Sequence, residues 1–310
     1  MNWVIFSPIL IPLVTAIACL FASGRLGAQR VISVVGATGL LASSVVLLSH
    51  HTDGQITALT VAGWDAPYGI TLVSDGFAAI MVLLNGICGL ACVVYGLGST
   101  DAVRERHGYH ICTHTLLAAV SGSFLAGDLF NLFVWFEVML ISSFVLITLG
   151  GTRGQLEGGI KYVTLNLIAS TLFLCGVGLL YGLAGTLNMA DLGFKLRVYD
   201  NPGVISAIAI LFVVCFGIKA GTFPFFFWLP ASYHTPPFAV SALFSGLLTK
   251  VGVYAMVRVF TVVFDMGEDS FIADILIWTA GLTMVTGVLG AAAQYEVRRI
   301  LSFHIISQIG

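Results

Sequence analysis

The sequence has 310 residues, of which 9% are charged and 58% hydrophobic, with a net charge of −2 and a mean hydropathy of +1.01. A soluble domain carries roughly 25% charged residues, so this composition excludes a water-soluble protein and gives no reason to expect nucleic acid as a partner. The cysteines form neither a CxxC pair nor a mixed Cys/His cluster, so no disulfide framework, metal or cofactor is expected; they are Cys19, Cys88, Cys92, Cys112, Cys175 and Cys215.

Long apolar runs follow one another along the whole chain. A helix needs roughly 20 apolar residues to cross a bilayer, and such runs predict spans at about 3–22, 31–49, 71–97, 110–126, 129–149, 159–184, 204–228, 237–262 and 272–292. A tenth run begins near Val297 and is still apolar at Gly310. We therefore expect an all-α, polytopic bundle with about ten spans, the tenth incomplete, and a protein that continues beyond this sequence.

The basic residues are distributed unequally between the two sets of loops. Alternate loops or their edges carry Arg25, Arg30, Arg104, Arg106, Arg153, Lys161, Arg298 and Arg299. The opposite loops hold Lys195 and Arg197, with Arg258 near the end of its span, and most of the acids: Asp53, Asp65, Asp191, Asp200, Asp265, Glu268 and Asp269. The positive-inside rule then places the N-terminus outside the cell and the Arg-bearing loops in the cytoplasm.

Three ionisable residues lie within spans rather than at their ends. Glu137 is about 3 Å from the middle of its predicted helix at 1.5 Å per residue, and Lys219 and Lys250 also lie near the middle of theirs. Ionisable groups at this depth are costly and are usually functional. We predict that Glu137, Lys219 and Lys250 form a proton relay near the membrane midplane.

The partner of Glu137 is expected on another helix, because its neighbours three and four residues away are all apolar. Lys219 lacks a counter-charge on its own helix as well, so Glu137 and Lys219 are predicted to pair directly. The alternative is a static pair that fixes helix register, but buried pairs are poor stabilisers. Lys250 has no visible acidic neighbour and is harder to explain as a structural residue.

A helix break is predicted directly after Lys219. Gly221 and Pro224 follow it within the segment IKAGTFPFFFWLP, and Pro224 can neither donate to the carbonyl of Ala220 nor pack against it without a clash. Transporters place ion sites at discontinuous helices of this kind. A simple proline kink, which is common in membrane helices, is the alternative.

Weaker candidates surround this relay. His234 in the loop SYHTPP and His304 in the tenth run are considered as further relay residues, although an exposed histidine is equally compatible with the first. His110 and His114 share a helix face, where interfacial polarity is favoured over a metal site. Other polar residues that could line a hydrated path or bond between helices are Thr164, Asn166, Ser170, Thr171, Ser241, Ser245, Thr249 and Tyr254.

Three stretches resemble a known family. They read GDLFNLFVWFEVMLISSFVLITLGG (127–151), FGIKAGTFPFFFWLPASYHTPPFAVSALFSGLLTKVGVYAMVRVF (216–260) and VRRILSFHIISQIG (297–310). They are similar to the antiporter-like subunits shared by respiratory complex I, membrane-bound hydrogenases and Mrp-type Na+/H+ antiporters. Their sequence resembles the Mrp branch most. The resemblance covers essentially the whole chain.

The resemblance implies a fold of about fourteen helices with two inverted five-helix units, each containing a broken helix. The family's relay residues correspond to Glu137, Lys219 and Lys250, and His304 falls where the family often has a polar residue. The implied division is 1–109 for three N-terminal helices, 110–262 for the first unit and 263–310 for the start of the second. A prokaryotic cell membrane and partner subunits of a hetero-oligomeric complex are implied as well.

The leading hypothesis is therefore a proton-translocating subunit of a multisubunit Na+/H+ antiporter, a transporter subunit rather than an enzyme. The alternative is a proton-pumping subunit of a redox-driven complex, either NADH:quinone oxidoreductase or a membrane-bound hydrogenase. A third hypothesis is a membrane scaffold that transports nothing. The residues of the relay do not distinguish the first two.

Overall fold

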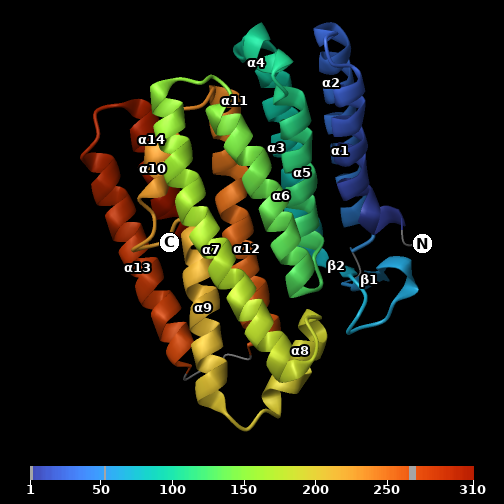
Figure 1. Ribbon diagram of the computed structural model, residues 1–310, viewed down its shortest axis with the longest axis vertical. Coiled ribbons are helices and arrows are strands. Elements are labelled where there is room, and N and C mark those ends of the chain that lie inside the picture. The colour runs from blue at the N-terminus through green and yellow to red at the C-terminus, as the bar shows by residue number, and fades with distance from the viewer. Residues whose placement is uncertain (1–2, 52–53, 265–269) are drawn as a thin grey trace.

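The computed structural model describes residues 3–51, 54–264 and 270–310, and the helices run roughly side by side along one long axis (Figure 1). Asp53, Asp265, Glu268 and Asp269, which entered the prediction of orientation, lie outside the described residues. One end of the bundle carries the short helix α4 (Ala102–Arg106) and is called the α4 end. The opposite end carries the short helix α8 (Met189–Arg197), with a two-stranded β-hairpin beside the start of that helix, and is called the hairpin end.

Eight helical segments of the described chain are long and apolar enough to cross a membrane, so the chain is a multi-pass membrane protein. They are α1 (Trp3–Phe21), α2 (Leu26–Ser49), α3 (Gly76–Ser99), α6 (Leu129–Thr148), α7 (Arg153–Ala184), α9 (Pro202–Ala220), the run Phe238–Val263 and α13 (Phe271–Ala292). The predicted number of ten is reached only if α5 (Tyr109–Leu125) and α14 (Val297–Ile309), of 17 and 13 residues, are counted with them.

The span predicted at 71–97 begins differently from the prediction. Its first residues form strand β2 (Thr71–Ser74), which pairs antiparallel with β1 (Thr57–Thr60), and the three-residue turn Val61–Gly63 follows β1. Helix α3 starts only at Gly76, because the carboxylate of Asp75 accepts a hydrogen bond of 2.8 Å from the backbone N–H of Ala78 and caps the helix. Hydropathy alone does not separate a short apolar strand from the helix behind it.

Helix α5 lies at the centre of the bundle, although its 17 residues make it shorter than any of the eight candidate spans. Every residue from Leu116 to Leu125 is buried, and the helix packs against α1, α3 and α6 and against α12 (Thr249–Arg258). The N-terminal helices α1 and α3 both pack against α5, and α3 also packs directly against α11 (Phe238–Leu243). Burial on all sides explains why α5 shows no amphipathic pattern in the sequence.

The seventh span is discontinuous, as predicted. Helix α9 ends at Ala220, and Gly221 follows in the left-handed conformation with φ of +77°. The chain resumes helical structure in the short α10 (Trp228–Ser232). Another short helix, α8 (Met189–Arg197), precedes α9 at the hairpin end (Figure 1).

The eighth span is helical throughout but contains two π-helical turns. It begins as α11 (Phe238–Leu243), passes through a π-helical turn at Phe244–Leu248, continues as α12 and ends in a second π-helical turn at Val259–Val263. Such turns occur mostly as single wide turns inside α-helices, frequently at functional sites. Lys250 is the second residue of the α-helical segment between them.

Candidate functional site

Glu137 and Lys219 are connected through the hydroxyl of Ser170. Ser170 Oγ, on α7, donates a hydrogen bond to Glu137 Oε1 on α6, and Lys219 Nζ, on α9, donates to the same Ser170 Oγ at 3.2 Å. All three residues are described, and no nitrogen–oxygen contact within 4.0 Å joins the lysine to the glutamate directly. The direct ion pair expected from the sequence is therefore replaced by a bridge through Ser170.

The surroundings of Lys219 are aromatic. Its ammonium lies 4.8 Å from the centroid of the Phe136 ring, a cation–π contact, and only 5% of the residue is exposed. Phe136, Phe173 and Phe216 contact one another beside it at centroid distances between 5.2 and 6.2 Å. Charged groups in such an apolar environment interact strongly, and a charge without a partner costs free energy there. The hydrogen bonds of Ser170 supply that partner to both Lys219 and Glu137.

The end of α9 presents Lys219 to this pocket. Lys219 is in the last turn, where the unsatisfied carbonyl groups of the helix favour a cation. The carbonyl of Gly217 accepts from the N–H of Thr222 at 2.9 Å, and the carbonyl of Ile218 accepts from the indole Nε1 of the buried Trp228, also at 2.9 Å. The backbone on both sides of the break is therefore held by specific hydrogen bonds.

Lys250 lies on the neighbouring helix and is held differently. Its Nζ donates to the backbone carbonyl of Ser245 at 2.5 Å, within the first π-helical turn of the span. It forms no hydrogen bond with Glu137 or Lys219 in the described part of the chain. The backbones that carry the two lysines nevertheless touch, because a Cβ built on Gly252 would lie 2.7 Å from the backbone nitrogen of Ala220.

The two histidines considered as further relay residues lie away from this bridge. His234 Nδ1 is 2.7 Å from the carbonyl oxygen of Pro230, beside a cavity of about 470 Å³ at the α4 end that Lys161 and Arg299 also line. His304 is exposed and contacts Gln308, with 3.1 Å between Nε2 atoms. In the described part of the chain, neither histidine hydrogen-bonds to Glu137, Lys219 or Lys250, and the part of both in ion transfer stays a prediction.

His110 and His114 are both buried at the α4 end, and the expectation that they serve as interfacial polar groups stays a prediction. The Nε2 of His110 is 3.8 Å from the carboxylate of the buried Glu105, which Arg30 holds at 2.8 Å, and His114 Nε2 is 2.8 Å from Ser33 Oγ. Within the described residues no group of three or more His, Cys, Asp or Glu side chains is arranged to hold a metal ion.

A polar cluster at the hairpin end was not anticipated. Arg258, at the end of α12, forms an ion pair with Asp75 and donates to the hydroxyl of Tyr254 at 2.8 Å, and Tyr254 donates to the carbonyl of Phe124 at 2.6 Å. Partial burial acts to raise the pKa of Asp75, but the Arg258 guanidinium and the N–H of Ala78 outweigh it and hold the pKa below its usual value.

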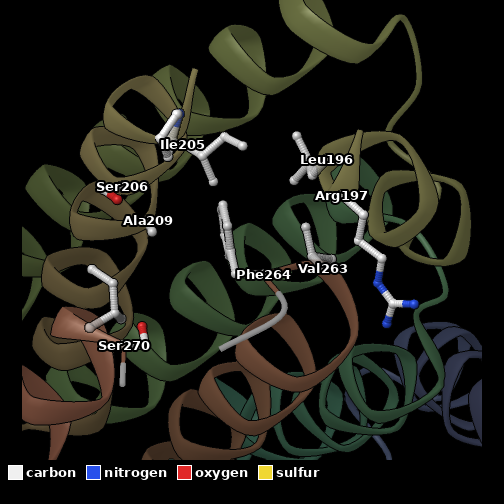
Figure 2. A pocket seen from close by; sticks show the side chains of 10 residues that line it. Leu196, Arg197, Ile205, Ser206, Ala209, Val263, Phe264 and Ser270 are labelled. Carbon is white, nitrogen blue, oxygen red and sulfur yellow. The ribbon is translucent and has the colours of Figure 1, made fainter. Parts of the chain in front are cut away.

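A cavity of about 370 Å³ at the hairpin end has a different character. Leu196, Ile205, Val263 and Phe264 turn apolar side chains toward it, and Arg197 and Ser206 also line it (Figure 2). Its described lining includes none of the three predicted relay residues. It is therefore separate from the Glu137–Ser170–Lys219 bridge.

Residues 126–310, more than half of the chain, match the family described as NADH:quinone oxidoreductase/Mrp antiporter, transmembrane, and the chain belongs to that family. Over its whole length it is 47% identical to the D subunit of the Na(+)/H(+) antiporter of Alkalihalophilus pseudofirmus and 45% identical to the D subunit of the Na(+)/H(+) antiporter of Bacillus subtilis. It spans 63% of the length of each of these relatives.

Solved structures show the same fold. The chain superimposes over its whole length on 58% of a chain in the Mrp complex of Dietzia sp. DQ12-45-1b, with a TM-score of 0.91 and 32% identity. A chain of the archaeal membrane-bound sulfane sulfur reductase gives a TM-score of 0.92 at 28% identity, with 99% of this chain and 63% of that chain covered. A chain of Thermus thermophilus respiratory complex I, at 22% identity with a TM-score of 0.75, shares the fold over 97% of this chain and 62% of its own.

Proposed function

We propose that the chain is a proton-translocating membrane subunit of a multisubunit Na+/H+ antiporter, with Glu137, Ser170, Lys219 and Lys250 as its relay. The observation that carries the proposal is the continuous hydrogen-bonded connection from Lys219 through Ser170 to Glu137 across three helices. The likeness, over the full length of this chain, to the D subunits of two Na(+)/H(+) antiporters supports the choice of an antiporter.

The bridge provides a balanced route for one proton. Lys219 as an ammonium passes a proton to Ser170 Oγ while the hydroxyl proton of Ser170 passes to the carboxylate of Glu137. A neutral amine and a protonated carboxyl result, so the local net charge is unchanged and no isolated charge is left in the apolar pocket. Lys219 is then reprotonated from the side of Lys250, whose helix packs directly against the end of α9.

The orientation is part of the same proposal. The arginine-rich connections between α1 and α2, α3 and α5, α6 and α7, and α13 and α14 belong to the α4 end, which we assign to the cytoplasm of a prokaryotic cell. The N-terminus and the β-hairpin are then outside. Other subunits of the complex, protons and Na+ are the proposed partners.

The test measures Na+-driven proton movement in everted membrane vesicles that contain the complete assembled complex. Glu137→Ala and Lys219→Ala are expected to abolish antiport, because each leaves the other group without its hydrogen-bonded counterpart in an apolar pocket. Lys161→Ala is the matched control, since Lys161 pairs with Glu157 on the exposed surface of α7. Unchanged antiport in both Glu137→Ala and Lys219→Ala would contradict the proposal. Normal transport after Lys219 and Lys250 are both neutralised would contradict it as well.

A second candidate is a proton-pumping subunit of a redox-driven complex, favoured by the likeness to the sulfane sulfur reductase chain. The same relay would then be driven by electron transfer in other subunits. Purification of the native complex through a tag on this chain separates the two. Partners that carry iron–sulfur clusters or flavin would overturn the antiporter assignment, and their absence together with Na+-dependent proton movement would support it.

A further inference from the structure

The break after Lys219 leaves a specific backbone group to be satisfied by another helix. Within residues 221–225, all of which the structure describes, the N–H groups of Gly221, Thr222 and Phe225 bond within the segment or to the end of α9, and Pro224 has none. The remaining N–H, that of Phe223, donates to Thr283 Oγ1 of α13 at 2.9 Å. A backbone donor at this depth has no bulk water to turn to.

Thr283 is an unusual residue on its own helix. The buried residues of α13 are only Ile272, Thr283 and Gly287, so most of the described helix faces away from the bundle interior. Thr283 is completely buried and is the polar member of that set. Its own hydroxyl proton is donated to the carbonyl of Thr279, one turn earlier, which leaves the oxygen lone pair directed to Phe223.

A cavity adjoins this contact. An apolar cavity of about 310 Å³ lies between α9, α12 and α13, lined among others by Thr222, Met256 and Thr279. Thr222 directly precedes Phe223 and Thr279 is one turn before Thr283, so the hydrogen bond from Phe223 to Thr283 lies at the edge of this cavity.

We infer that Thr283 is a positioning residue for the relay: its hydroxyl ties α13 to the broken helix and so fixes the end of α9 that presents Lys219 to Ser170. This inference rests on the proposed function. Without the hydroxyl, the N–H of Phe223 has no acceptor, and the break relaxes until it finds one. Lys219 is four residues before Phe223. Its hydrogen bond to Ser170 is already 3.2 Å long, so a further increase in that distance would break it.

The experiment compares Thr283→Val, which keeps the shape but removes the hydroxyl, with Thr283→Ser, which keeps the hydroxyl. The control is Thr286→Val, one turn along α13, where the hydroxyl bonds only to carbonyls of the same helix. Antiport rate per assembled complex and its pH profile are measured in everted vesicles. We expect Thr283→Val to lower the rate about tenfold and displace the pH profile, with the other two within about twofold of the parent.

Each other outcome has a defined meaning. A Thr283→Val complex with the parent rate and pH profile overturns the inference, and so does a Thr283→Ser complex as impaired as Thr283→Val. If Thr283→Val does not assemble, Thr283→Ala is measured in its place, and failure of both to assemble assigns the hydroxyl to folding and overturns the positioning role. Glu137→Ala and Lys219→Ala are measured in parallel: loss of antiport there with a normal Thr283→Val complex contradicts this inference alone.

Discussion

The hydroxyl of Ser170 has one proton and serves two ionisable groups at once. It accepts from Lys219 and donates to Glu137, so the direction of its hydrogen bonds matches an ammonium on one side and a carboxylate on the other. A direct lysine–glutamate contact would have to open for a proton to leave the pair. A hydroxyl between them passes the proton by reversing its own orientation, with the heavy atoms in place.

Replacement of this hydroxyl gives the first prediction. Ser170→Ala removes both hydrogen bonds and leaves Lys219 and Glu137 without their bridge, which we expect to slow antiport at least about tenfold, since a hydrogen bond to a charged group contributes about 1.5–3 kcal/mol. Ser170→Thr keeps the hydroxyl and is expected to retain most of the rate. Vesicle assays normalised to assembled complex provide the measurement, and full activity of Ser170→Ala would show that the bridge is not the route.

Sequence reasoning reached part of this site. Glu137, Lys219 and Lys250 stand out because ionisable residues at mid-span are rare in an apolar chain. Ser170 was one of several polar residues on its span, and nothing in the sequence separated it from Asn166, because the choice depends on how α7 is rotated against α6 and α9. For the same reason the lysine and glutamate were predicted to touch, although a third side chain lies between them.

At the scale of elements, the contact between α9 and α12 determines how near the two lysines come. The absence of a side chain at Gly252 lets the backbone of α12 reach the last residue of α9, with a built Cβ only 2.7 Å from the nitrogen and 3.0 Å from the Cα of Ala220. Ala220 follows Lys219 directly, and Gly252 is two residues beyond Lys250. Small residues allow such close approach of membrane helices.

A methyl group at this position is therefore predicted to push the helices apart. Gly252→Ala meets backbone atoms that cannot rotate away, so we expect a lower Tm of the assembled complex and slower antiport. Gly178→Ala on α7, where a built Cβ meets nothing within 4 Å, is the control and should leave both quantities unchanged. Equal Tm and rate for Gly252→Ala and the parent would contradict the close approach.

The elements themselves were predictable to different degrees. The break in the seventh span followed from Gly221 and Pro224, because both residue types carry strong backbone preferences. The strand at Thr71–Ser74 did not, because it is continuous in the sequence with an apolar helix and pairs with Thr57–Thr60 across a long connection rather than a tight turn. The two π-helical turns leave no sequence signal of their own.

At the scale of the whole molecule, the hairpin end is fastened by the ion pair of Asp75 and Arg258. Asp75 caps α3 of the N-terminal helices, and Arg258 ends α12, so the pair joins segments that the proposed division at residue 109 assigns to different units. The Arg258 guanidinium also lies 5.4 Å from the ring centroid of Phe77 and 5.2 Å from that of Tyr254. The division into units at 109 and 262 stays a prediction.

Loss of this ion pair is predicted to weaken the assembled fold. Arg258→Gln should lower the free energy of unfolding by about 1–2 kcal/mol, because it removes hydrogen bonds to Asp75 and Tyr254 in a partly buried site. Because the folded-state pKa of Asp75 is lowered, the contribution is present at neutral pH and is lost as the pH falls through that pKa. Tm measured from neutral to acidic pH should therefore differ between parent and variant at neutral pH and converge in acid.

The control for that prediction is Arg299→Gln, since Arg299 pairs with Glu296 on the exposed surface at 3.3 Å. A double variant with Asp75→Asn should cost less than the sum of the two single changes, because the shared interaction can be lost only once. Additive effects of the two changes would show that the pair does not act as a unit.

The π-helical turn before α12 changes how the eighth span must be drawn on a helical wheel. In an uninterrupted α-helix, the step from Ser241 to Lys250 corresponds to a net rotation of about 180° at 100° per residue, so the two side chains would point in opposite directions. The single extra residue accommodated in the wide turn at Phe244–Leu248 reduces that rotation to about 80°. By this geometry, the side chains of Ser241 and Lys250 are expected to point within about a quarter turn of each other, whereas a helical wheel drawn from the sequence alone would place them on opposite faces.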